Sequence, residues 1–368
     1  MAKLIGAKGY RINEMIVGAR NCLVKWGNLK PGENALIVTD ANVDPQLIEA
    51  LATAAASEGA TVLKMIMPTP PIEHQEPPVA VGEAMKHVDL VAICCSKLSV
   101  QNQTSLDAQK YGTRIMGLGP SAEAMASAGA KFPPEIIFEL ATRISKQWSA
   151  GKKIRVTCER GTDLQADINP DHVIGFEGAG APLGTRFKKG ADRRGRIAFW
   201  EGGFGTVGLW PEWTTNGVAY FDALQGFGYR LDPPFKIVVK DGRVVDLGGR
   251  PEQIAYFNQL HEVFGPDFAH IGEIMIGLNP FTSLDFSDSS HLQAHRRAGT
   301  VHVAFGNSVD DHRRVKPGIH VDNLIIKPTI YIDDDICVDQ GRLVMIDDPD
   351  IQKMLKQYGV DLKAHIDI

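Results

Sequence analysis

The chain contains 368 residues, of which 44% are hydrophobic and 23% are charged. These proportions are typical of a globular protein, and the length favours two domains over one. The formal net charge of -5 argues against a general nucleic-acid-binding protein, because such a protein needs a basic surface.

The first 150 residues alternate short apolar runs with segments of helical spacing. The apolar runs predict strands at 35–39, 62–67, 90–94 and 114–118. The helical spacing predicts helices at 45–57, 79–87 and 135–148. Continuous apolar strands separated by helices are typical of a parallel sheet that is covered on both faces. We therefore predict a Rossmann-like α/β domain over residues 1–150, which ends before Gly151-Lys152-Lys153.

A glycine-containing segment, Gly117-Leu-Gly-Pro-Ser-Ala122, follows the last of these strands. It is superficially similar to a dinucleotide-binding loop. However, it follows the fourth strand instead of the first, and Pro120 lacks the backbone N–H that a phosphate needs. We predict a strand-to-helix turn here and no nucleotide cofactor.

Beyond residue 150 the strand signals come in hairpins. Asp241-Gly242 predicts a type I′ turn between two apolar runs. Within residues 324–346, Gln340-Gly341 likewise lies between two apolar runs and predicts a second hairpin turn. Helical spacing predicts one helix at 251–264 and another at 348–358. We expect residues 151–368 to form an α+β domain with a mainly antiparallel sheet that carries the functional site.

Features of the whole chain bear on its cellular compartment. The beginning, MAKLIGAKGYRINEM, lacks the apolar core of a signal peptide, and the sequence has no run of about 18 apolar residues. The cysteines are odd in number and include no CxxC pair: Cys22, Cys94, Cys95, Cys158 and Cys337. We therefore expect no disulfide framework, no membrane span and a cytoplasmic location.

Polar residues with metal-binding chemistry are placed among apolar residues of the second half. His270 stands at the head of one apolar run with Glu273 three residues later, His302 lies inside another, and His320-Val-Asp322 follows. Because side chains alternate along a strand, His320 and Asp322 leave the same face. Two histidines and one carboxylate on one face of an ion leave its other positions open for substrate and for O2 or water. Since an unpaired charge is costly among apolar residues, this pattern predicts a metal site.

The segments that contain these residues resemble a known superfamily. Ala269–Pro280, Gly299–Gly306 and Ile319–Asp322 resemble the aminopeptidase T group of metallopeptidases and the related 2,5-dihydroxypyridine 5,6-dioxygenases, iron enzymes that open a pyridine ring. The resemblance is strongest from about residue 154 to about residue 335 and looser over the first 150 residues. It implies a homo-oligomeric enzyme with a small-molecule substrate.

The two branches of this superfamily imply different centres. In the peptidase branch Glu273, His302, His320 and Asp322 match ligands of two ions, but Thr206 stands near the place of a further glutamate and Val309 stands at that of a tyrosine. In the dioxygenase branch two histidines and an aspartate hold one Fe(II). His270, which precedes Gly277-Leu-Asn-Pro280, would match the first histidine, and His320 with Asp322 would complete the set. The histidine that this branch has in its N-terminal domain finds no counterpart.

We therefore expect His270, His320 and Asp322 to be metal ligands. His302 and Glu273 are the candidate catalytic residues for proton transfer; they could also hold a second ion or orient the ligands. Trp210, Glu212, His291 and His295 are candidate substrate-binding residues. The spacing of His291 and His295 suits a helix, whereas their polar neighbours indicate an exposed turn at the mouth of the site. Trp210 could equally be a core residue.

These expectations combine into two functional hypotheses. The first is a mononuclear Fe(II) dioxygenase that uses O2 to cleave a hydroxylated nitrogen heteroaromatic ring. The second is a hydrolase of small amides or peptides with Zn, Co or Mn, possibly dinuclear, in which Glu273 activates a metal-bound water. Neither hypothesis requires nucleic acid or a membrane. The number and identity of the bound metal ions distinguish the dioxygenase hypothesis from the hydrolase hypothesis.

Overall fold

The computed structural model describes residues 11–71, 75–97, 100, 102–174, 197–200, 205–211, 213–225, 227–284, 292–306 and 320–365. The chain divides into two compact units, the first formed by 1–134 with 180–204 and the second by 135–179 with 205–368. The domain boundary predicted from the sequence lies at residue 150. Helix α7 (Pro134–Ala150), which precedes that boundary, belongs almost entirely to the second unit.

In its described part, the first unit contains a parallel sheet with the strand order β2-β1-β3-β4-β8. The strands are β1 (Asn34–Asp40), β2 (Thr61–Met67), β3 (Leu90–Cys94), β4 (Arg114–Leu118) and β8 (Ile197–Trp200). The predicted parallel sheet is therefore confirmed. Strand β8 was not predicted, because it comes from beyond the expected boundary and joins the sheet next to β4.

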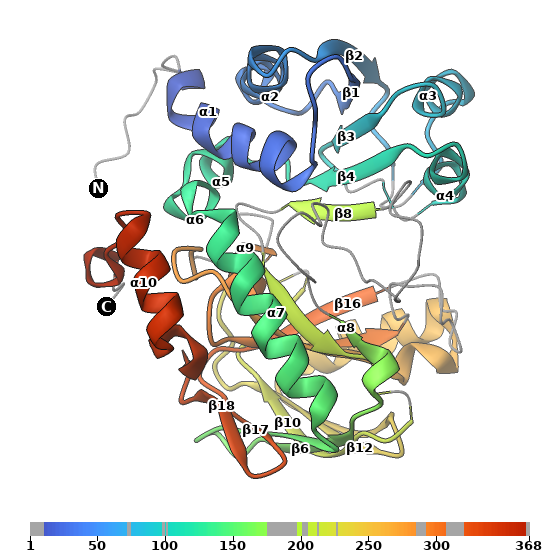
Figure 1. Ribbon diagram of the computed structural model, residues 1–368. Coiled ribbons are helices and arrows are strands. Elements are labelled where there is room, and N and C mark those ends of the chain that lie inside the picture. Colours follow the sequence, from blue (N-terminus) through green and yellow to red (C-terminus); the bar gives the residue numbers. More distant parts are fainter. Residues whose placement is uncertain are drawn as a thin grey trace. The chain divides into compact units, whose positions relative to one another are not determined.

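Helices cover both faces of this sheet (Figure 1). They are α1 (Ile12–Arg20), the π-helical segment Asn21–Trp26, α2 (Pro45–Ser57), α3 (Val79–Met85), α4 (Gln103–Lys110), α5 (Ala122–Ala126) and α6 (Ala128–Lys131). Helix α2 begins where Asp44 accepts a hydrogen bond from the Gln46 amide, with Pro45 in the first turn. Ser121 caps α5 in the same way, so the strand-to-helix turn expected after β4 is present.

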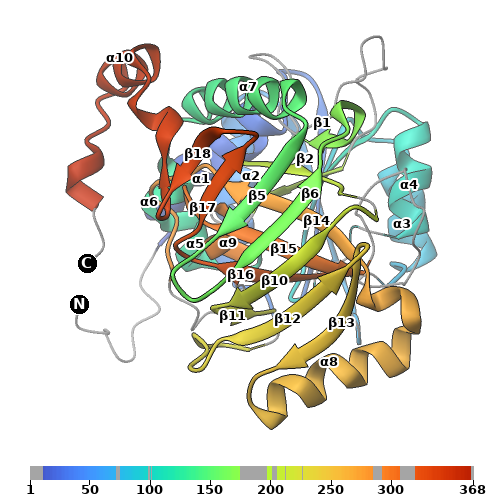
Figure 2. The same cartoon turned by 90° about the horizontal axis from the view of Figure 1, so that it is seen from below.

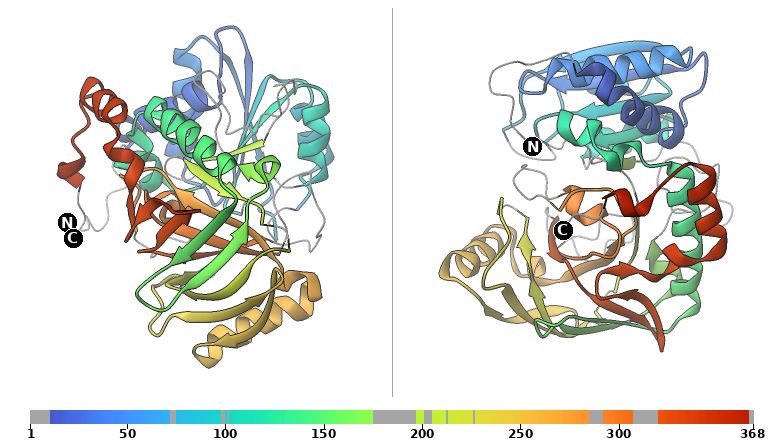
Figure 3. Two further views of the ribbon diagram at one scale, coloured as in Figure 1. Left: turned by 60° about the horizontal axis from the view of Figure 1, so that its bottom comes forward. Right: turned by 90° about the vertical axis from the view of Figure 1, so that its left-hand side faces the viewer.

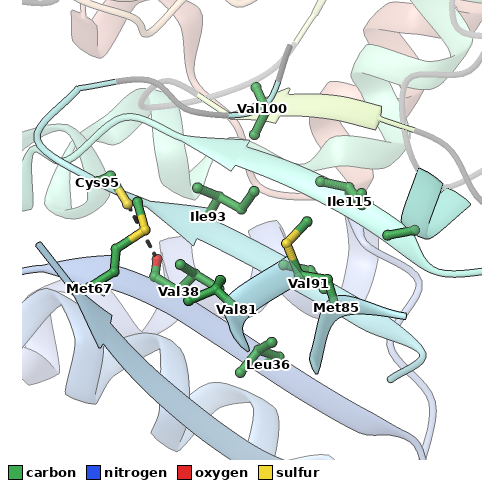
Figure 4. Close-up of a cluster of buried hydrophobic side chains, with 11 residues drawn as sticks. Leu36, Val38, Met67, Val81, Met85, Val91, Ile93, Cys95, Val100 and Ile115 are labelled. Atoms are coloured by element: carbon green, nitrogen blue, oxygen red, sulfur yellow. Dashed lines mark hydrogen bonds between the residues drawn. The ribbon is translucent and has the colours of Figure 1, made fainter. Parts of the chain in front are cut away.

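A buried apolar cluster joins α3 and α4 to one face of the parallel sheet (Figure 4). Val81 and Met85 of α3 pack there against Leu36 and Val91 of the sheet. The side chains come from alternate positions along each strand, as the period of two requires.

The second unit contains antiparallel pairings between its described strands, as predicted. One sheet has the order β13-β12-β10-β6-β5-β17-β18-β19, and the other has the order β11-β16-β15-β14-β9-β7 (Figure 2). The strands of the first are β5 (Lys153–Thr157), β6 (Asp163–Asp167), β10 (Asn216–Phe221), β12 (Phe235–Lys240), β13 (Arg243–Gly248), β17 (Thr329–Ile332), β18 (Asp335–Asp339) and β19 (Arg342–Leu343). Those of the second are β7 (Val173–Ile174), β9 (Thr206–Leu209), β11 (Ala223–Leu224), β14 (Ile271–Gly277), β15 (Val301–Gly306) and β16 (His320–Ile325).

Two predicted turns connect strands of the larger sheet. Asp241 and Gly242, between β12 and β13, have φ angles of 47° and 74°. Gln340 and Gly341, between β18 and β19, have φ angles of 46° and 85°. A type I′ turn requires positive φ at both central residues, so the backbone agrees with the sequence-based prediction at both places.

Helices α7, α8 (Pro251–Phe264), α9 (Leu292–Arg296) and α10 (Pro349–Gln357) complete the second unit, with 3₁₀ segments at Pro170–His172, Pro266–Ala269, Val344–Asp347 and Leu362–His365. Arg143 of α7 forms ion pairs with Asp348 and Asp350 at the beginning of α10, which lies beside α7 (Figure 3). Among the residues that the structure describes, no helix is both long and apolar enough to span a bilayer.

One face of the six-stranded sheet is packed by aromatic side chains. Phe305 of β15 is buried, and its ring makes edge contacts with Phe221 of β10, Phe257 of α8 and Phe268. Ile271 and Val321, the strand partners of Phe305, are buried as well. This face therefore belongs to the apolar core, and Glu273, His302, His320 and Asp322 leave the opposite face.

Candidate metal centre

The strand register brings the predicted site residues to one face of the six-stranded sheet. Ala304 of β15 pairs with Glu273 of β14 on one side and with Asp322 of β16 on the other. His302 and His320 lie two residues from this row on their own strands, so their side chains leave the same face. The strands that carry these residues, β14, β15 and β16, come from separate segments of the sequence and lie side by side (Figure 2).

A β-bulge adds His270 to this face. His270 and Glu273 are three residues apart, a spacing that would put them on opposite faces of a regular strand. The register shifts between Ile271 and Glu273, which inserts one extra residue and restores the common face. On the neighbouring strand, the Gly306 amide donates a hydrogen bond to the His270 carbonyl at 2.8 Å, and Gly306 also pairs with His320 of β16. Gly306 therefore lies between the two histidines, and it has no side chain.

Four side chains converge closely at the centre of this face. Oε1 of Glu273 lies 3.3 Å from Nε2 of His302 and 3.3 Å from Nε2 of His320. Oδ1 of Asp322 lies 3.1 Å from Nε2 of His320 and 4.0 Å from Nε2 of His302. The potential ligand atoms of Glu273, His302 and Asp322 all lie within 4.8 Å of one another.

The charges of this cluster are strongly coupled. Burial alone raises the pKa of Glu273, but the His320 charge and the hydrogen bonds from His302 and His320 outweigh burial and lower it to about 2. The same balance of burial against the neighbouring histidines holds the pKa of Asp322 well below its ordinary value. Burial lowers the pKa of His320, but Glu273 and Asp322 together raise it well above its ordinary value. Both carboxylates are therefore ionised, and a proton on His320 stabilises them where a divalent cation could do so instead.

His270 has a different environment on the same face. Its ring centroid lies 4.1 Å from that of Trp213, and the Arg243 guanidinium lies 4.9 Å from the centre of the Trp213 ring. Burial, followed by the charge of Arg243, lowers the pKa of His270 to about 4. His270 is therefore a neutral imidazole at physiological pH, the form that binds metals.

The chemistry of these residues fits a divalent metal ion. The Nδ1 atoms of His270 and His302 are buried and make no hydrogen bond to any described residue. Buried polar atoms without hydrogen-bond partners are uncommon and call for an explanation such as an ion. Imidazole nitrogens with carboxylate oxygens suit Fe(II), Zn(II) and Mn(II) alike. Among the described residues, Glu273, His302 and Asp322 lie close enough together to hold one ion, with His320 beside them. His270 reaches the same face through the strand register, and its printed contacts are with Trp213 and Arg243 instead of with this cluster.

Asp322 is held from several directions. The side-chain oxygen of Gln225 accepts a hydrogen bond from the Asp322 amide at 2.8 Å, and the Gln225 amide donates to the Asp322 carbonyl at 3.0 Å. Oδ2 of Asp322 lies 3.4 Å from Nδ1 of His295. Gln225 was not singled out in the sequence, because neither its spacing nor its neighbours form a recognisable motif.

The predicted substrate-binding residues lie in different parts of the structure and differ in their contacts. His295 was expected in an exposed turn, but it lies in the short helix α9 and is 1% exposed, so that expectation is wrong. Its ring packs 4.9 Å from that of His302, which accounts for the burial. Trp210 is buried against His172, whereas Trp213 contacts His270. Glu212 and His291 lie outside the described residues.

Near the place where a peptidase glutamate was expected, the structure has Thr206, a buried residue at the beginning of β9. Thr206 pairs with Gly277, two residues beyond Met275 on β14. A hydroxyl is a weaker metal ligand than a carboxylate, so this position does not supply the bridging group of a dinuclear peptidase centre.

Comparisons with known proteins identify a family and a fold for this chain. The sequence model of the family described as NicX, 2,5-dihydroxypyridine 5,6-dioxygenase, matches residues 18–345. The structure of a 2,5-dihydroxypyridine dioxygenase from Pseudomonas putida KT2440 is similar over 90% of this chain and 97% of that chain, with a TM-score of 0.73 and 18% identity. Wild-type AmpT from Thermus thermophilus, an aminopeptidase T, is similar over 91% and 100%, with a TM-score of 0.62 and 15% identity. No curated protein matches the chain. At these identities the two structures establish the fold.

Proposed function

Because this chain belongs to the 2,5-dihydroxypyridine 5,6-dioxygenase family, we propose that it is an Fe(II)-dependent dioxygenase that cleaves the ring of a hydroxylated nitrogen heteroaromatic compound. The observation that supports this proposal most is the common face of His270, His320 and Asp322, which depends on the bulge in β14. The proposal includes a homo-oligomeric, cytoplasmic enzyme, as the sequence analysis expects.

His270, His320 and Asp322 would hold the iron as two imidazoles and one carboxylate. An Fe(II) ion bound in this way would supply Lewis acidity and open positions for O2 and for the substrate oxygen. Neutral His270 is suited to this role because Arg243 and burial disfavour its protonation. Trp213, packed against its ring, limits the orientations that His270 adopts.

His302 and Glu273 would handle the proton of the substrate hydroxyl group. Nε2 of His302 faces the cluster and lies 3.3 Å from Oε1 of Glu273. As His302 takes a proton at Nε2, the ionised Glu273 beside it stabilises the imidazolium. The same carboxylate contacts His320 at 3.3 Å, so it also orients a ligand. Because Glu273 and His302 are buried, these charges interact more strongly than they would in water.

The decisive experiment is metal analysis of anaerobically purified protein together with O2-electrode traces on 2,5-dihydroxypyridine. We expect close to one iron per chain and substrate-dependent O2 uptake. The Asp322→Ala variant should lose both, whereas Asp339→Ala, at an exposed position in β18, should keep both. Two non-iron ions per chain without O2 uptake would overturn the proposal.

A hydrolase is the second candidate, and one observation favours it. Glu273, His302 and Asp322 form a ligand group of their own, which could hold a second ion beside the first. With two ions the protein would be suited to metal-assisted attack of water on an amide. The same metal analysis, combined with release of amino acids from small peptides, tests this candidate.

A further inference from the structure

His295 has no role in the proposed function. His295 is 1% exposed, although it lies in a helix of five residues that follows a polar segment. Its Nδ1 atom lies 3.4 Å from Oδ2 of Asp322, and its ring is 4.9 Å from the ring of His302. A polar side chain that is buried at this depth beside a candidate metal ligand requires a physical explanation.

The backbone around α9 holds His295 firmly in this place. The Thr300 hydroxyl donates to the carbonyl oxygens of Ala294 and Arg297, at 3.0 and 2.8 Å. The Asn279 amide donates to the Arg296 carbonyl at 2.8 Å, which ties the end of α9 to the segment after β14. The position of His295 is therefore set by the same strand that carries Glu273.

The two oxygens of Asp322 face different partners. Oδ1 faces Nε2 of His320 at 3.1 Å and Nε2 of His302 at 4.0 Å, on the side where the candidate ligands converge. Oδ2 faces Nδ1 of His295 at 3.4 Å, a contact that lies outside hydrogen-bond geometry. Gln225 holds the backbone of Asp322 through both its amide and its carbonyl, so the main chain from which the carboxylate extends is fixed.

We propose that His295 is a positioning residue: with a proton on Nδ1, which faces Oδ2 of Asp322 at 3.4 Å, it attracts that oxygen, so that Asp322 offers a metal ion Oδ1 alone. This inference rests on the proposed function for the identity of the metal site. A carboxylate that binds through both oxygens would occupy one more position on the ion, and that position is needed by substrate or O2. Groups that orient a ligand from behind typically change metal affinity or activity by about 10- to 100-fold when they are removed.

A pair of amide variants tests the proposal without a change of charge. In His295→Asn the amide nitrogen takes the place of Nδ1, whereas in His295→Gln it takes the place of Nε2. His295→Ala removes the donor, and His87→Ala, at an exposed histidine of the first unit, controls for nonspecific binding of metal by histidine. Circular dichroism and thermal melting identify any variant that does not fold.

The readout is titration with Co(II), followed by visible absorption, because the intensity of the cobalt bands falls when the coordination number rises. We expect His295→Asn to keep the wild-type affinity and spectrum. His295→Gln and His295→Ala should bind Co(II) about 10- to 100-fold more weakly and with weaker absorption bands. With iron, the same two variants should lower kcat more than they change KM, because open positions on the ion are lost while substrate contacts remain.

Equal Co(II) affinity and equal spectra for the Asn and Gln variants would overturn the assignment of His295, even if the alanine variant fails to fold. This result is separable from the proposed function. If wild-type protein consumes no O2 with 2,5-dihydroxypyridine while the Asn and Gln variants differ, the proposed function fails and the role of His295 stands. If the wild type consumes O2 and all His295 variants bind Co(II) alike, only the role of His295 fails.

Discussion

Replacement of Glu273 by glutamine separates a role in proton transfer from a role in metal binding. Glu273 is 3% exposed, and its Oε1 atom lies 3.3 Å from both His302 and His320. Glutamine keeps the shape and one acceptor oxygen but removes the charge. A charge-assisted hydrogen bond contributes about 1.5–3 kcal/mol. If that stabilisation of the His302 imidazolium is lost from the transition state, kcat falls about 10- to 150-fold.

The assay is steady-state O2 uptake with 2,5-dihydroxypyridine, with iron measured on the same preparations. We expect Glu273→Gln to keep close to one iron per chain and a nearly unchanged KM while kcat falls by the amount given above. Glu252→Gln, on the exposed side of α8, is the matched control and should behave as wild type. A folded Glu273→Gln protein that loses its iron would show that Glu273 is a ligand, and an unchanged kcat would remove it from the proton pathway. Either result would refute the reasoning.

Further predictions concern stability and can be checked by urea or thermal unfolding. Phe305→Ala should cost about 3–5 kcal/mol, because it leaves a cavity among three aromatic rings; a loss below about 1 kcal/mol would contradict the packing of that face. Gly242→Val should cost at least about 1–2 kcal/mol because of the φ angle of 74°, and a neutral result would mean that the turn is not type I′ in solution. Arg155 lowers the pKa of Asp163 through a side-chain hydrogen bond. This ion pair therefore stabilises the fold at pH values above the ordinary carboxyl pKa of 3.8, and the stabilisation is lost as the pH falls through the lower pKa of Asp163 in the folded protein. Arg155→Ala should therefore destabilise slightly at pH 7 and progressively less as the pH falls below 3.8; a loss that does not change with pH would contradict the ion pair.

The sequence by itself determined the features that depend on neighbouring residues. Strand β3 and helices α2 and α8 occupy the predicted residues, because apolar period and capping groups act within a few positions. The type I′ geometry at Asp241-Gly242 follows from the tolerance of these residue types for positive φ. His320 and Asp322 share a face because side chains alternate along any strand.

The tertiary structure decided what depends on register between distant segments. His270 and Glu273 share a face only because β14 is bulged against β15, and their spacing of three residues argues for the opposite. The burial of His295 and the contacts of Gln225 with Asp322 require α9 and β11 to reach the site from elsewhere in the chain. The addition of β8 to the parallel sheet is likewise a pairing across a long loop. Local sterics set how a side chain leaves its own strand, but the pairing of strands far apart in sequence sets which side chains meet, and one extra residue in a strand reverses the face.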